Sequence, residues 1–286
     1  MSAIPPGAQQ SHCQPPDSLP FNDRQPDAIR LYPLSNYTFG VKETQPEEDP
    51  SVKDRLKRLE EHYANHGMRR TCEAVLVCHE HNHPHVLMLQ IANAFFKLCI
   101  PTSTHYRRTN ADGRASPGDY IPYSSEEIPA FKSILASILS PPASSSLASR
   151  DTDAGSSDWD IHSTIATWYR PNFETFMYPY LPPHVTRPKE VKKLYLIELP
   201  RTKVLSVPKN MKLLAVPLFE LYDNSARYGP QLSAIPHYLS RLRWEMVDEQ
   251  GEVVAWTPGG KNPEGLSTKV LADGGSDETR MEDAGV

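Results

Sequence analysis

The sequence is poor in cysteine and has no long apolar run, and each absence excludes a class of protein. Its four cysteines form no CxxC pair, and two of them lie inside apolar, strand-like runs; they are Cys13, Cys72, Cys78 and Cys99. This pattern indicates reduced core thiols rather than disulfides or a zinc site. No stretch of about 20 apolar residues could span a membrane, and no signal peptide is recognisable at the first residues. We therefore expect a soluble, intracellular protein that does not contact a membrane.

Common catalytic motifs are also missing. The chain has no Ser/His/Asp set and no Gly-rich phosphate loop. The run from His79 to His85 has the ligand-like spacing HxHxHxH, but Asn82 and Pro84 mark a chain reversal that would scatter the rings. We predict a polar hairpin turn at this run, with a metal site as the alternative. We expect no cofactor and no bound metal.

Charge and proline are distributed unevenly along the chain. Residues 1–30 are rich in Pro, Gln, Ser and Asp and predict a disordered N-terminal tail. Residues 245–286 carry ten acidic and three basic side chains, so we expect an acidic, mobile C-terminal tail. The segment 31–244 predicts one domain with insertions at 99–116 and 140–157. The formal charge of -5, less the -7 of the C-terminal tail, leaves residues 1–244 near +2, which is too weak to predict nucleic-acid binding.

Hydrophobic periodicity predicts helices interleaved with strands. A helix is expected over 52–66, because Ser51 and Asp54 form a capping pair and Gly67 stands at the end. Further helices are expected over 128–139 and near 231–242, with strands over 71–79, 85–92, 95–98, 193–199 and 212–217. The chain has no long repeat. The pattern therefore indicates a single α/β or α+β domain.

The pair Phe95-Phe96 falls in the short strand expected over 95–98. Adjacent strand residues point to opposite faces, so one ring can lie in the core while the other is exposed. An exposed ring near Arg55, on the cationic face of helix 52–66, could stack on a nucleic-acid base. The pattern alone favours ordinary core packing.

Seven strings of the sequence carry a resemblance: LYPLSNYTFG (31–40), HGMRRTCEAVLVCHEHNHPHVLMLQ (66–90), FFKL (95–98), YRPNFE (169–174), YPYLPPHVTRPKE (178–190), VPKNMKLLAVPLFELYDN (207–224) and YGP (228–230). Together they resemble the small Nudix subunit of pre-mRNA cleavage factor Im, the family also called cleavage and polyadenylation specificity factor subunit 5. The resemblance implies an α/β/α Nudix sandwich with a mixed sheet, a homodimer, and a nuclear location. It also implies binding of UGUA elements in single-stranded pre-mRNA, beside a larger subunit that has an RNA-recognition motif.

The helical glutamates of an active Nudix enzyme are absent. Those glutamates hold divalent cations against a pyrophosphate, because Mg²⁺ prefers hard oxygen ligands. With the box aligned on residues 117–119, the corresponding helical positions hold Ser133, Ile134, Ser137 and Ile138. Shifting the alignment by one or two residues recovers Glu126 or Glu127 but puts no acid on residues 130–140. We therefore predict that the chain is not an enzyme; the alternative is a Nudix hydrolase or sensor of dinucleoside polyphosphates.

The resemblance also implies which residues contact RNA and the partner. Arg55 and Glu47, or its neighbour Glu48, would lie near base edges. Glu73 would hold Arg55 or a base edge, although a surface ion pair between Arg55 and Glu73 is the other reading. Phe95 would stack on a base, with Phe96 and Leu98 completing the wall and with Tyr228 and Gly229 on the other side. Tyr180 and Tyr238 match positions where the family docks its larger subunit.

Overall fold

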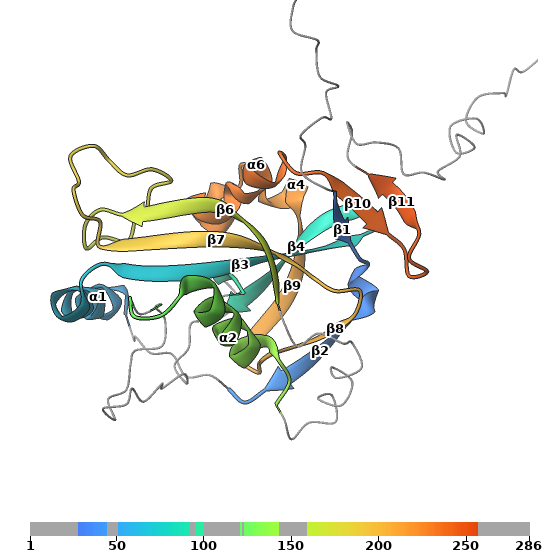
Figure 1. Ribbon diagram of the computed structural model, residues 1–286, viewed down its shortest axis with the longest axis horizontal. Helices are drawn as coiled ribbons and strands as arrows, with labels where there is room; N and C mark the ends of the chain where they lie inside the picture. Colours follow the sequence, from blue (N-terminus) through green and yellow to red (C-terminus); the bar gives the residue numbers. More distant parts are fainter. Residues whose placement is uncertain are drawn as a thin grey trace, which may run out of the picture.

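A mixed sheet of six strands forms the middle layer of the molecule (Figure 1). The computed structural model describes residues 28–44, 51–91, 95–99, 121, 123–142 and 159–256. The order β5-β4-β3-β7-β6 runs across the sheet, and β9 pairs with the other edge of β4. β3 and β7 are parallel, and the remaining pairs are antiparallel. The strands are β3 (Arg69–Glu80), β4 (His83–Ile91), β5 (Phe95–Leu98), β6 (Asp160–Arg170), β7 (Glu190–Glu198) and β9 (Met211–Pro217).

Helices cover both faces of this sheet. On one face lie α4 (Leu218–Leu221), α5 (Ser225–Ser233) and α6 (Ile235–Leu239), and on the other lies α2 (Glu127–Leu139) with the parallel pair β2 (Tyr37–Lys42) and β8 (Lys203–Pro208) (Figure 1). The helix α1 (Val52–His66) lies beyond one end of β3 (Figure 1). This architecture confirms the expected α/β/α sandwich.

Two separate hydrophobic cores explain why the central strands read as continuous apolar runs. Val75 and Val77 of β3 pack with α5 and α6, whereas Leu76 and Cys78 pack with α2 and β8. A strand covered on both faces needs apolar side chains at successive positions, since alternate residues point to opposite layers. The same alternation decides which polar residues of β3 and β7 share one face of the sheet.

A small third sheet corrects the predicted domain limits. It joins β1 (Ile29–Leu31) in parallel to β10 (Trp244–Val247), which continues into β11 (Val253–Trp256). The prediction of a mobile tail from residue 245 is therefore wrong for 245–256, and order begins before residue 31. Met246 and Val247 are buried, while Asp248 lies in the turn and accepts hydrogen bonds from the backbone N–H groups that follow.

The first predicted helix is confirmed with its caps. It covers Val52–His66, the Ser51 hydroxyl accepts a hydrogen bond from the Asp54 N–H at 3.1 Å, and Gly67 ends the helix with φ of 79°. The predicted helix near 231–242 is instead divided between α5 and α6. Gly229 has non-helical angles inside α5, and a proline stands near the start of α6.

The histidine run is a hairpin, as predicted. β3 turns into β4 through two residues with positive φ, His81 and Asn82. His79 is buried with its Nε2 2.7 Å from the carbonyl oxygen of Val247, whereas the His83 ring lies against Phe219. Within the described ranges, no group of three or more His, Cys, Asp or Glu side chains is placed to hold a metal ion.

Three of the four cysteines are buried and free, namely Cys72, Cys78 and Cys99. Burial raises the pKa of each thiol to about 12, and the three side chains lie in the core without a disulfide partner, as expected. The backbone of Cys99 forms an isolated antiparallel β-bridge with Ala74 of β3, and Cys99 thus belongs to the core. The sequence pattern had placed it at the start of an insertion. The fourth cysteine, Cys13, and residues 100–116 and 143–157 of the two predicted insertions lie outside the described residues.

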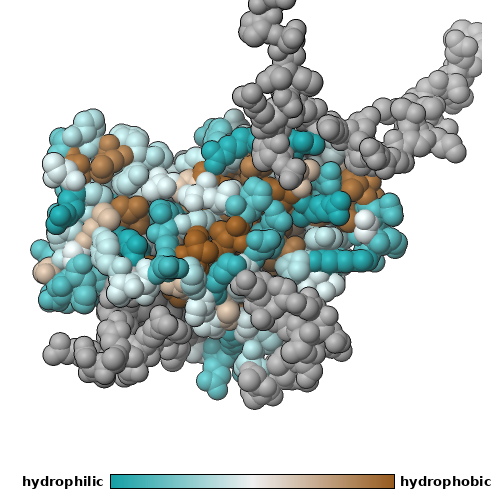
Figure 2. Space-filling view, viewed as in Figure 1, coloured by the Kyte–Doolittle hydropathy of each residue, from teal (hydrophilic) through white to brown (hydrophobic). Residues whose placement is uncertain are grey.

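The surface of the described domain mixes polar and apolar residues. On the face shown in Figure 2, apolar groups lie among polar ones, with a larger group near the centre of the view. No helix within the described residues combines the length and apolar character needed to cross a membrane.

Candidate nucleic-acid interface

A cleft of about 430 Å³ opens on the face of the sheet that α5 covers. Its walls come from α1, β3, β5, α5 and the segment that follows β6. Six of the eight predicted RNA contacts line it, although they come from distant parts of the sequence: Arg55, Glu73, Phe96, Leu98, Tyr228 and Gly229. Phe95 is not part of the lining, and Glu47 and Glu48 lie outside the described residues.

The alternation of side chains along β3 and β7 places polar residues on the floor of this cleft. Thr71 and Glu73 lie on the same face of β3 as the buried Val75, and Glu190 and Lys192 lie on the same face of β7 as Leu194. The parallel register sets Thr71 opposite Lys192. Two carboxylates and their cations are therefore brought together at one end of the β3–β7 pair.

Glu73 is fixed by two partners from other elements. Its carboxylate is buried, forms an ion pair with Lys192, and accepts a hydrogen bond of 2.7 Å from the Gln231 side-chain amide. Lys192 in turn donates to the Gln231 oxygen at 3.4 Å. We expected Glu73 to hold Arg55 or a base edge; within the protein the structure pairs it with Lys192 and Gln231 rather than with Arg55. Neither of these partners was predicted from the sequence.

Glu190 is the second carboxylate of the floor. It accepts hydrogen bonds from the Arg170 Nε at 2.8 Å and from the Thr71 hydroxyl at 3.0 Å. Burial by itself would raise its pKa, but the charges of Arg69, Lys192 and Arg170 outweigh burial and lower the pKa to about 2. Glu190 therefore stays ionised and neutralises part of a cationic cluster.

The aromatic wall comes from two rings. The Phe96 and Tyr228 ring centroids are 4.7 Å apart, and the Arg227 guanidinium lies 5.5 Å and 5.3 Å from them. The Tyr228 hydroxyl donates to Glu220, and burial with this bond raises the Tyr228 pKa to about 12. The next residue, Gly229, has φ of 79°, which L side chains rarely adopt. Sequence reasoning had no signal for Arg227 or Glu220.

Two predicted contact residues remain available to a ligand. The Arg55 side chain is exposed at the cleft, and within the described part of the chain its guanidinium has no ion pair or hydrogen bond. The Phe95 ring is 68% exposed at the start of β5, next to the lining residue Phe96. A free guanidinium thus lies at the cleft, and an open ring lies one residue along β5 from its lining.

Positive charge dominates the lining. Six of its side chains are cationic and two are carboxylates, which leaves a balance of +4. The cations are Arg55, Arg58, Arg69, Lys97, Arg170 and Lys192. Arginines and lysines beside aromatic rings form the combination that binds single-stranded nucleic acid, since cations attract the phosphates and rings stack on bases.

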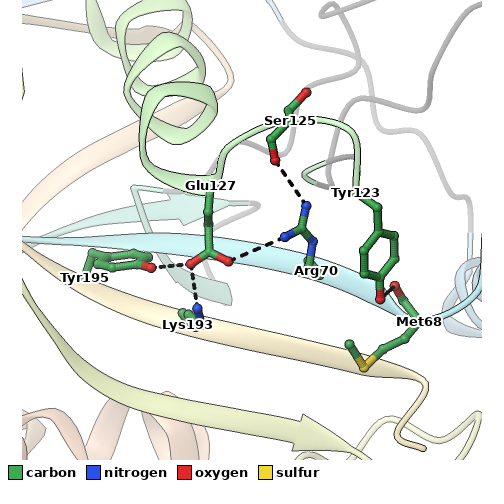
Figure 3. A network of polar contacts seen from close by, with 7 residues as sticks. All are labelled: Met68, Arg70, Tyr123, Ser125, Glu127, Lys193 and Tyr195. Carbon is green, nitrogen blue, oxygen red and sulfur yellow. Dashed lines mark hydrogen bonds and ion pairs between the residues drawn. The ribbon is translucent and has the colours of Figure 1, made fainter.

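A second polar network lies on the opposite face of the sheet, below the start of α2 (Figure 3). Glu127 accepts hydrogen bonds from Lys193 at 2.7 Å and from the Tyr195 hydroxyl, and an Arg70 nitrogen lies 4.0 Å from its other oxygen. Burial opposes ionisation of Glu127, but the bonds from Lys193 and Tyr195 lower its pKa overall. Glu127 is the one carboxylate on α2, and it is already paired with Lys193 and Arg70.

The two tyrosines predicted to dock a partner differ in exposure. Tyr180 is 57% exposed and lies beside Tyr178, with ring centroids 5.8 Å apart. Tyr238 of α6 is partly buried and packs against the core. Both reach the surface, but Tyr180 presents far more of its ring.

Comparison with known proteins identifies the family. The family model NUDIX_2, described as "Nucleotide hydrolase", matches residues 27–242. Pre-mRNA cleavage factor Im 25 kDa subunit 2 of Arabidopsis thaliana is 47% identical over 77% of this chain and 96% of its own length. Subunit 1 of that plant is 42% identical over 77% of this chain and 87% of its own.

A more distant relative agrees. Cleavage and polyadenylation specificity factor subunit 5 of Dictyostelium discoideum is 37% identical over 74% of this chain and 93% of its own length. The resemblance drawn from the seven strings is thereby confirmed. The chain belongs to the Nudix family and, within it, to the family of the cleavage factor Im 25 kDa subunit.

Proposed function

We propose that this protein is a non-catalytic subunit of the mRNA 3′-end processing machinery, and that it binds single-stranded RNA of the UGUA type in the cleft between β3, β5 and α5. The names of its relatives support the processing role. The observation that carries RNA binding is the cleft itself, in which the unpaired Arg55 lies beside a fixed polar floor, with the exposed Phe95 next to the lining residue Phe96.

The floor is suited to reading base edges. Unstacked bases of single-stranded RNA expose hydrogen-bonding edges that side chains can read. The Glu73 carboxylate and the Gln231 amide are held in place by each other and by Lys192, so their oxygens and N–H groups need little ordering on binding. A fixed arrangement favours one base sequence over others, since a mismatched base leaves buried polar groups unpaired.

The proposed absence of catalysis rests on α2. Nudix hydrolysis needs several carboxylates at one metal site, because Mg²⁺ takes hard oxygen ligands and the phosphates need neutralised charge. Along α2 the single carboxylate, Glu127, is bound by Lys193, Tyr195 and Arg70. A cation at that place would have to displace two positively charged side chains.

A Nudix hydrolase or sensor of dinucleoside polyphosphates is the second candidate. The family description and the cationic cleft favour it, since polyphosphates need positive charge. Incubation with a dinucleoside polyphosphate and Mg²⁺ or Mn²⁺ separates the two candidates. We expect no phosphate or nucleotide product; turnover that is abolished by a chelator would overturn the non-catalytic assignment.

The Phe95→Ala variant tests the stacking contact. Because the ring is exposed, its loss should leave the fold intact and weaken binding of a UGUA oligonucleotide by about 1–3 kcal/mol. Fluorescence anisotropy measures the affinity, and thermal unfolding checks the fold. Phe219→Ala is a matched control, because that ring is 66% exposed and lies against His83, whereas Phe95 adjoins the lining residue Phe96. Equal losses in both variants would argue against stacking at Phe95.

The proposal includes an assembly and a compartment. We infer a homodimer, a larger subunit with an RNA-recognition motif, and a nuclear location, in line with the relatives named as cleavage factor subunits. The exposed Tyr180 supports docking of that larger subunit, and the exposed part of the Tyr238 ring would contribute to the same contact.

A further inference from the structure

The segment that follows β6 places a third phenylalanine beside the cleft. Thr175, Phe176 and Met177 belong to the cleft lining, and they come from a different part of the chain than the β5 strand that carries Phe95. Met177 packs against the core, whereas the Phe176 side chain is 65% exposed. An apolar ring therefore lies open to solvent in a lining that is otherwise rich in cations.

This segment is fastened at its base. Tyr169 and Tyr178 exchange backbone hydrogen bonds of 2.7 Å and 2.8 Å, which close the segment between them. The Arg170 guanidinium donates to the carbonyl oxygen of Glu174 and also pairs with Glu190 in the floor of the cleft. The position of the segment is thus tied to the polar floor.

Aromatic packing anchors the same segment to α1. The Phe173 ring meets Tyr63 edge-on with centroids 5.6 Å apart, and the Lys189 ammonium lies 4.3 Å from the Tyr63 centroid and 5.3 Å from that of Phe173. Phe173 thus holds the segment, while the Phe176 ring stays exposed in the lining of the cleft. A ring presented by an anchored segment loses little conformational freedom when a ligand covers it.

We propose that Phe176 is a second stacking platform, which binds the base of a nucleotide flanking the RNA segment held at Arg55 and Phe95. This inference rests on the proposed RNA-binding function. A stacked base would cover the exposed ring, while the neighbouring cations attract the phosphates on either side. Because every base has an aromatic face, the subsite tolerates any flanking nucleotide and extends the length of RNA that is bound rather than the sequence that is read.

An oligonucleotide length series tests the subsite. The probes are the tetranucleotide UGUA and two longer RNAs, one extended by two nucleotides at the 5′ end and one at the 3′ end. We expect the wild type to bind one extended RNA more tightly than the tetranucleotide. Phe176→Ala should weaken binding of that extended RNA by about 5- to 30-fold and leave the tetranucleotide unchanged.

Matched variants separate stacking from other effects. Phe176→Trp should restore the extended affinity, and its added indole fluorescence, compared with wild type, should change with the extended RNA but not with the tetranucleotide. Phe219→Ala, equally exposed but outside the cleft, should bind all three RNAs like the wild type. Phe95→Ala should weaken all three, because its ring contacts the central segment.

The outcomes distinguish this inference from the proposed function. If the wild type binds the tetranucleotide but Phe176→Ala has no effect on either extended RNA, the second platform is refuted and the RNA site stands. Uniform weakening of all three RNAs by Phe176→Ala would also refute it, since it would place Phe176 in the central site. If the wild type binds none of them, both proposals fail.

Discussion

Replacing Glu190 with glutamine is expected to lower the free energy of unfolding by about 3 kcal/mol at pH 7, since its pKa falls from 4.5 in a free side chain to about 2. The carboxylate lies among Arg69, Arg170 and Lys192, and it is the neutralising charge nearest to them on β7. Glutamine keeps the shape of the side chain and can still accept the hydrogen bond from Thr71. It lacks the negative charge, however, so the three cations are left close together without it. Urea unfolding of both proteins at pH 7 measures the difference.

The pH dependence gives an independent check. A depressed folded-state pKa contributes stability that is fully present above the unfolded pKa, near 4.5, and is lost as the pH falls toward about 2. The difference between wild type and Glu190→Gln should therefore shrink when unfolding is repeated at pH 3. Glu198→Gln, on the same strand with a partly exposed carboxylate, should show little difference at either pH. A difference that does not change with pH would show that Glu190 acts through packing instead of charge.

Replacing Arg55 with alanine is expected to lower the affinity for a UGUA oligonucleotide by about 10- to 100-fold, the value of a hydrogen bond to a charged group. The guanidinium is exposed at the cleft and is not engaged by another side chain of the described domain, so its donors are free for a base edge or phosphate. Anisotropy titrations measure the affinity. The melting temperature should change little, because removal breaks no ion pair or hydrogen bond among the residues that the structure describes.

Lys53→Ala is the control for long-range charge. Lys53 is exposed on the same helix and does not line the cleft, and its removal changes the net charge of the protein by the same amount. We expect its effect on affinity to be small. Equal losses in Arg55→Ala and Lys53→Ala would mean that Arg55 contributes only through the electrostatic field, not through a contact.

Local sequence signals predicted the elements that local chemistry determines. The helix 52–66 could be predicted because its capping serine and terminal glycine lie next to its apolar positions. The buried central strands could be predicted because coverage on both faces demands continuous apolar runs. Residues 245–256 were mispredicted because two short strands lie in an acidic region, and the acidic composition hid their six apolar side chains.

The polar floor of the cleft could not be predicted from the sequence. Glu73, Lys192 and Gln231 lie on β3, β7 and α5, and they meet because of the parallel β3–β7 register and because α5 covers that face. Sequence patterns show which residues are neighbours along a helix or strand, but they do not show the register between strands that are distant in the sequence. The family resemblance implied that Glu73 holds Arg55 or a base edge, and it did not point to Lys192 or Gln231 as its partners within the protein.

The most direct test of the central claim compares two RNAs on the wild-type protein. Anisotropy titrations with a UGUA oligonucleotide and a scrambled oligonucleotide of the same composition, in the same buffer and salt, measure sequence selectivity. We predict that UGUA binds tighter by about tenfold or more, because a mismatched base leaves polar groups of the cleft floor unpaired. Equal affinities for the two RNAs would contradict sequence-selective binding.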